Sequence, residues 1–183
     1  MTIEKYLEEN AKELGIHQYG FTTVDKISFS PQVRDLCEKN YCGHYGKSWA
    51  CPPAVGTYEE CMARIKKYDR IMVFTTLHPL EDSFDFEGMM AGQKSHGETA
   101  DKVFKGVVQH LKGDVLNLSK DGCGICETCS YPDSPCRFPD KLAPAIESYG
   151  VEVNRLAAAT GVNYINGANT VTYFGCVLFH NQE

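Results

Sequence analysis

Hydrophobic residues recur at helical spacing in several parts of the chain. The first such segment, residues 3–14, ends before Gly15, a natural helix stop. Thr57 and Glu60 have the spacing of a capping box, which predicts a helix from there to about Tyr68. The same periodicity predicts helices at about 87–112, between Cys136 and Gly150, and at 152–160.

Shorter segments rich in β-branched and aromatic residues predict strands at 17–24, 70–77 and 114–119. Segments 163–165 and 170–179 flank Asn166-Gly167, a turn signal that favours a closing hairpin. Residues 30–53 carry several glycines and prolines and are predicted to be irregular. Strands that alternate with helices predict an α/β fold: a single domain over 1–183, with a central sheet flanked by helices and cysteine-rich loops at about 37–61 and 121–139.

Composition narrows the class of protein. Of 183 residues, 43% are hydrophobic and 23% are charged, an ordinary globular profile that can build a core without crosslinks. The first ten residues, MTIEKYLEEN, lack the basic start and apolar stretch of a secretory signal, and no apolar run is long enough to cross a bilayer. We therefore expect a cytoplasmic protein with no membrane association, in which the nine cysteines are reduced and serve metal binding or catalysis.

The charge pattern bears on partners. The net charge is −6, and basic residues are scattered rather than clustered. This pattern argues against a nucleic-acid surface. The same pattern is compatible with a protein partner.

Four cysteines form the second cysteine group, which has the spacing Cys-x2-Cys-x2-Cys-x6-Cys: Cys123, Cys126, Cys129 and Cys136. Three thiolates at every third residue, with a fourth farther along, are typical of ferredoxin-type [4Fe–4S] ligation. Glycines beside the first cysteine allow backbone amides to approach cluster sulfurs. A four-cysteine zinc site is the alternative, although zinc ribbons use two Cys-x2-Cys pairs separated by a longer spacer.

The first cysteine group has the spacing Cys-x4-Cys-x8-Cys, with a fourth cysteine after nine more residues: Cys37, Cys42, Cys51 and Cys61. The Cys51-Pro52 step is similar to the Cys-Pro step of ferredoxins. Cys61 is predicted near a helix start, where the helix dipole favours a thiolate, so it is a candidate fourth ligand. Alternatively, Cys61 is a buried apolar residue and leaves one iron open, or cysteines of the two groups exchange clusters. Cys176 lies in an apolar strand and is expected to belong to the core, with a reserve role as ligand.

With both groups in view, the chain resembles a family of small prokaryotic proteins known only as predicted metal-binding proteins. The resemblance rests on CGHYGKSWACPP at 42–53, CGICETCSYPDSPCRFPDK at 123–141, KLAPAIESYGVEVNRLA at 141–157 and NTVTYFG at 169–175. It implies metal binding through six cysteines, with Cys37 and Cys61 as additions: Cys42, Cys51, Cys123, Cys126, Cys129 and Cys136. It implies no particular reaction.

Three hypotheses for function follow. The first is an iron–sulfur protein with two [4Fe–4S] clusters that exchanges electrons with a partner redox enzyme. The second is an enzyme whose open-site cluster acts in sulfur transfer or removal, and the third is a zinc-binding scaffold. Whether the protein is an enzyme stays open, because no nucleotide-binding loop or nucleophile–base motif is present and a small-molecule substrate is unknown.

Overall fold

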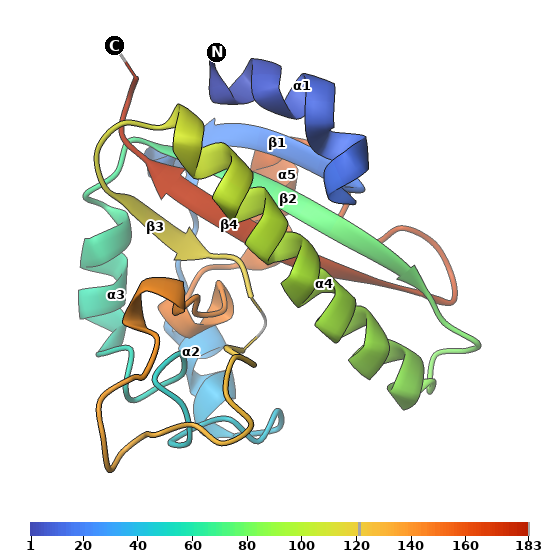
Figure 1. The fold of residues 1–183 in the computed structure, drawn as a ribbon. Helices are drawn as coiled ribbons and strands as arrows, with labels where there is room; N and C mark the ends of the chain where they lie inside the picture. The colour runs from blue at the N-terminus through green and yellow to red at the C-terminus, as the bar shows by residue number, and fades with distance from the viewer. Residues whose placement is uncertain (121, 183) are drawn as a thin grey trace.

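A four-stranded antiparallel sheet forms the centre of the fold in the computed structural model, which describes residues 1–120 and 122–182 (Figure 1). The strand order is β1-β2-β4-β3, so the two longest strands pair in the middle of the sheet. The strands are β1 (Gln18–Thr23), β2 (Arg70–Pro79), β3 (Val115–Leu118) and β4 (Thr170–Phe179). The predicted α/β class, with a central sheet flanked by helices, is confirmed.

Side chains on the two central strands alternate between two hydrophobic cores. On β2, Met72 and Phe74 face one core, whereas Ile71 and Val73 face the other. Successive residues of a strand point to opposite faces of a sheet, so a strand covered on both sides must be apolar throughout. This requirement explains the continuous apolar runs in β2 and β4.

Helices cover both faces of the sheet (Figure 1). The α1 helix (Ile3–Leu14) and the long α4 helix (Phe86–Val107) pack on the face of Met72, and α3 (Tyr58–Ile65) and α5 (Val153–Thr160) pack on the opposite face. The remaining helical segments are α2 (Pro31–Glu38) and the 3-10 turns η1 (Val24–Lys26), η2 (Val108–His110), η3 (Pro139–Lys141) and η4 (Glu147–Tyr149). Among the described residues, no helix combines the length and apolar character needed to cross a bilayer.

Local signals located several helix ends correctly. The α1 helix ends at Gly15, whose φ of 84° is the left-handed conformation that glycine adopts readily. The capping box at the start of α3 is present: Glu60 N–H donates to the Thr57 hydroxyl, and Thr57 N–H donates to the Glu60 carboxylate. Both predictions rest on contacts within a few residues.

Three predictions of local structure were wrong. Residues 163–165 form no strand, and β4 pairs with β2 and β3 instead of closing a hairpin. Between Cys136 and Gly150 the chain forms only the short turns η3 and η4, because Pro144 cannot donate a helical hydrogen bond. Within 30–53 the chain forms α2, whose first turn carries Pro31, a position that suits proline.

Candidate metal centre

The thiols of the second cysteine group line a single cavity of about 950 Å³, which lies between α4 and the loop that follows β3. All four of these cysteines are partly exposed: Cys123, Cys126, Cys129 and Cys136. The predicted loop, at about 121–139, begins at Asp121, which lies outside the described residues. The fold therefore brings the whole predicted ligand set of this group to one place.

Hydrogen-bond donors surround the thiol of Cys129. Burial by itself would raise the pKa of this thiol, but hydrogen bonds from the backbone N–H groups of Tyr131 and Trp49 and from the Ser48 hydroxyl lower the pKa below its ordinary value. A lowered pKa favours the thiolate, which is the form that ligates metals. Ser48 and Trp49 belong to the first cysteine-rich loop, so this loop supplies donors to a cysteine of the second.

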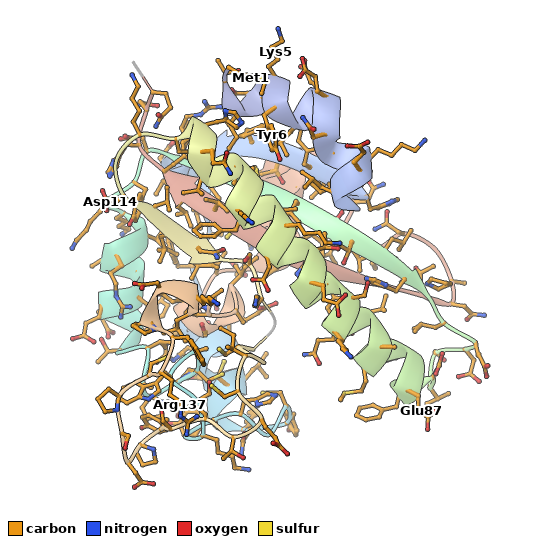
Figure 2. The ribbon with its side chains drawn as sticks, viewed as in Figure 1. Met1, Lys5, Tyr6, Glu87, Asp114 and Arg137 are labelled. Atoms are coloured by element: carbon orange, nitrogen blue, oxygen red, sulfur yellow. The ribbon has the colours of Figure 1, made fainter. Side chains whose placement is uncertain are left out.

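Aromatic and polar contacts hold the two loops together. The indole Nε1–H of Trp49 donates to the carbonyl of Ser134 at 3.1 Å, and the Trp49 ring meets the Tyr131 ring edge-on at a centroid distance of 4.9 Å. Within the second loop, the Arg137 guanidinium donates to the Thr128 carbonyl at 2.9 Å. Figure 2 shows Arg137 among the loops, away from the sheet. The contacts fix the loop around the cysteines.

The thiols of Cys126 and Cys136 act on the thiol of Cys123. The pKa of Cys123 is raised, first by burial and also by the neighbouring Cys136 and Cys126 thiols, while the Ile125 backbone N–H and the Lys120 ammonium act in the opposite direction. Thiols that raise the pKa of a neighbouring thiol in this way are close to it in space. A positive metal or cluster would remove the mutual repulsion of their thiolates.

The α4 helix anchors the segment that leads into the second loop. His96 is fully buried and bonds through Nε2 to the Ser119 carbonyl at 3.0 Å and through Nδ1 to the Thr76 hydroxyl at 2.9 Å. The ammonium of Lys120 forms an ion pair with Asp101 at 2.8 Å. Because a carbonyl only accepts, Nε2 carries the ring hydrogen and Nδ1 accepts from Thr76. Two residues of α4 thus hold the chain just before Cys123.

The first cysteine group does not line the cavity described above. The pKa of Cys37, near the end of α2, is raised by burial, lowered by Arg34 and raised by the Cys42 thiol, so Cys37 and Cys42 are neighbours. Cys42 is exposed, whereas Cys51 is buried. These cysteines line neither this cavity nor a second one of about 340 Å³, and their predicted ligation stays a prediction.

Cys61 lies inside the hydrophobic core, between two arginines. It is fully buried on α3, and its sulfur lies 3.6 Å from Nη1 of Arg34 and 3.8 Å from Nη2 of Arg64. The thiol itself donates to the Val55 carbonyl at 3.5 Å. Arg34 also donates to the carbonyls of Ser148 and Gly56, so this cluster joins α2, α3 and η4. Cys176 is likewise fully buried, on β4, and burial raises the pKa of its thiol.

A protein-family model matches most of the chain. The model for DUF2284, described as a predicted metal-binding protein, matches residues 21–179, which include all four strands except the first three residues of β1. The chain belongs to the DUF2284 family. No curated protein and no solved structure matches it. Membership agrees with the resemblance found in the sequence and supports metal binding as a property of the family.

The second cysteine group offers four thiols as candidate donors for the metal that the family description predicts. Four thiols with the ferredoxin spacing line one cavity, and donors lower the pKa of Cys129. In the described part of the chain, no three cysteine, histidine, aspartate or glutamate side chains are yet close enough to hold one ion. The donor chemistry fits a thiolate-bound group. A metal bound by all four thiols would require these thiols to lie closer together than they do in this structure.

Sequence reasoning did not identify the residues that support this site. The sequence makes Trp49 a candidate for excluding water from a cluster, with a core position as the alternative, and indicates a structural or exposed role for His96, but it gives no signal for Ser48 or Lys120. Their contacts with the second loop span about twenty residues or join separate loops. No local pattern could have shown them.

Proposed function

We propose that this chain holds a [4Fe–4S] cluster on Cys123, Cys126, Cys129 and Cys136 and exchanges electrons with a partner redox protein. The observation that carries the proposal is the placement of all four thiols on one cavity, with the spacing of a ferredoxin motif. Zinc is the competing occupant of a four-cysteine site. The triple Cys-x2-Cys-x2-Cys spacing favours iron–sulfur.

The chain's own residues would bind and tune the cluster. Backbone and hydroxyl donors to Cys129 stabilise negative charge on its sulfur, and hydrogen bonds to ligand sulfurs help to set the potential of iron–sulfur centres. Trp49 and Tyr131 pack against each other beside Cys129 and limit the access of water. Lys120 and Arg137 bring positive charge to the cavity. A bound cluster supplies reversible one-electron chemistry.

Exposure of the loop supports exchange with a protein partner. Gly124, Glu127 and Thr128 alternate with the cysteines and are exposed, so a partner could approach the cluster closely. Reduced, partly exposed thiols also suit a reducing compartment, and we propose the cytoplasm. The first cysteine group would add a second [4Fe–4S] cluster through Cys37, Cys42 and Cys51, with Cys61 as the predicted fourth ligand.

The decisive experiment is metal analysis of protein purified without oxygen. Iron, acid-labile sulfide and zinc are measured per chain, followed by EPR before and after reduction with dithionite. About four irons and four sulfides, with a reversible EPR signal, would support one cluster on the second group, and about eight of each would support two clusters. Stoichiometric zinc without sulfide would refute the proposal and leave a metal-stabilised scaffold.

A further inference from the structure

The cavity that contains the four thiols is larger than a cluster requires. Its volume of about 950 Å³ is at the upper end of the range of roughly 300–1,000 Å³ typical of small-molecule sites. The four cysteines line part of it, and residues of α4 from Met90 to Asp101 line another part. A cubane bound by the thiols would occupy the part next to the cysteines, so the part along α4 would remain available.

One face of α4 is directed at this cavity instead of at a packing partner. Met90, Lys94, Gly97 and Asp101 follow one another at intervals of three or four residues, which places them on the same side of a helix. A Cβ built on Gly97 would meet no atom within 4 Å, so the space in front of this residue is open. This face of α4 therefore lines the cavity, and the space in front of Gly97 is not filled by other side chains.

A buried cation lies in the wall of this space. Lys120 lines the cavity with only 8% of its side chain exposed, and its partner Asp101 is 65% exposed at the edge. Of the described lining residues, four are lysine or arginine and three are aspartate or glutamate, although the chain carries a net charge of −6. These side chains leave one positive charge in excess, before any charge on the cysteine sulfurs is counted. A desolvated ammonium forms strong hydrogen bonds with anions.

Apolar side chains line the same cavity. Met90 is 53% exposed and Phe138 is 42% exposed, and both line the cavity together with Ile125 and Leu142. Small-molecule sites commonly combine such apolar walls with a few placed polar groups that orient the ligand. A ligand that satisfies both features has an anionic head for Lys120 and an apolar body for Met90 and Phe138.

We propose that the space between α4 and the second cysteine group binds a small organic anion with an apolar body, with its anionic head on Lys120. The site rests on the proposed function only in its position beside the cluster, because α4 and Lys120 form it without the metal. It gives the protein a small-molecule ligand in addition to a protein partner. Lys120 also lines a smaller cavity of about 340 Å³, which Gly97 does not reach.

Calorimetric titration of the protein isolated without oxygen tests the site. The probe is phenylbutyrate, and phenylbutyramide, which has the same shape but no charge, is the matched neutral compound. We expect phenylbutyrate to bind at a single site and the amide to bind at least about tenfold more weakly, as loss of a charge-assisted hydrogen bond predicts. Equal affinity for the two compounds, or no binding of either, would overturn the proposal.

Variants with opposite expected effects sharpen the test. Lys120→Met keeps the length of the side chain and should weaken phenylbutyrate binding about tenfold or more. Asp101→Asn removes the competing carboxylate at an exposed position, so binding should become several-fold tighter. Tighter binding to Lys120→Met, or weaker binding to Asp101→Asn, would contradict the placement of the anionic head.

A third variant fills the cavity. Gly97→Leu should abolish binding, and it improves helix propensity, so the protein should fold. Ser95→Leu, at an exposed position on α4 outside the cavity lining, is the control and should bind as the parent does. If Gly97→Leu binds normally, the ligand lies elsewhere, for example in the smaller cavity, and the proposal fails.

Iron and sulfide are measured on every sample. Failure of the cluster proposal then shows as missing iron with ligand binding retained, whereas failure of the anion site shows as normal iron content without binding.

Discussion

The two cysteine groups of this protein have similar numbers of thiols but very different surroundings. The second group lies in a partly exposed loop, and its four thiols line one cavity. In the first group, Cys61 is fully buried among core residues and held by two arginines, Cys51 is buried, and Cys42 is exposed. Thiol density in a sequence therefore does not show how many sites a fold assembles. Burial and hydrogen-bond partners differ between the two groups, although the spacing of both predicts metal ligation.

The largest effect is expected when one thiol is removed from the second group, which tests whether this group holds the metal. Cys129→Ala should reduce the metal content of this site by more than about tenfold, because loss of a ligand exceeds the effect of losing a supporting contact. Iron and sulfide analysis of protein isolated without oxygen measures the change. Cys176→Ala, which removes a fully buried thiol on β4, is the control and should retain the metal. Full iron content in Cys129→Ala would place the metal elsewhere.

The anchor of the second loop should make stability depend on pH. Burial is the main reason why the pKa of His96 is lowered to about 4. An unfolded histidine has a pKa of about 6.5, so between these values the unfolded chain binds a proton that the folded chain does not. The contribution of His96 to the free energy of unfolding should therefore be complete above about pH 6.5. The free energy of unfolding should then fall by about 3 kcal/mol as the pH drops towards 4.

Urea unfolding of the parent and of His96→Gln at several pH values isolates this contribution. The variant keeps a donor for the Ser119 carbonyl but cannot titrate, so its stability should change less across the same range. At pH 7 it should be less stable by about 1–3 kcal/mol, because the Thr76 hydroxyl loses its partner ring nitrogen. Parallel pH profiles of the two proteins would show that His96 does not carry the effect.

Substitution of Cys61 tests how far this buried residue of the first group stabilises the fold. Cys61→Val preserves an apolar side chain but removes the sulfur near Arg34 and Arg64 and the donor to the Val55 carbonyl. The Val55 carbonyl still accepts from Arg64, and Arg34 still donates to two carbonyls, so the free energy of unfolding should fall by only about 1 kcal/mol, as expected for the loss of hydrogen bonds to the sulfur. Denaturant unfolding measures the loss.

Metal content of the same variant separates the two interpretations of Cys61. Iron on the second group should stay at the parent level if Cys61 belongs to the scaffold. A loss of half the iron from a parent protein with two clusters would instead identify Cys61 as a ligand, as the sequence predicts.

The smallest expected effect concerns the contact between the two loops. Ser48→Ala removes the hydroxyl that bonds to the Cys129 sulfur while the backbone donors remain. Fewer hydrogen bonds to a ligand sulfur stabilise the reduced cluster less, so the midpoint potential should fall by an amount on the order of tens of mV. Redox titration followed by EPR measures the shift, and Ser130→Ala, whose hydroxyl bonds to the Pro135 carbonyl, is a control within the second loop. An unchanged midpoint potential in Ser48→Ala would show that the Ser48 hydroxyl does not influence the metal centre.

Local signals in the sequence predicted most of the regular elements but few of their partners. Helix α1, the capping box of α3 and the strands on either side of α4 were located within a few residues, because each depends on neighbours along the chain. The hairpin predicted around Asn166 was wrong, since β4 finds its partners in β2 and β3, more than fifty residues away. Pairing of distant strands is decided by the burial of both faces of the sheet, which no local window contains.

The sequence by itself determined the α/β class, the family of predicted metal-binding proteins and the spacing that favours four thiol ligands at 123–136. The tertiary structure alone decided that Ser48 and Trp49 donate hydrogen bonds to Cys129. It also decided that His96 and Asp101 hold the segment just before the second loop. The position of Cys61 between two arginines is likewise a result of the tertiary structure. The reason is physical. Ligand spacing acts over a few residues of chain, whereas desolvation and hydrogen bonding depend on segments that meet only when the sheet and its helices have packed.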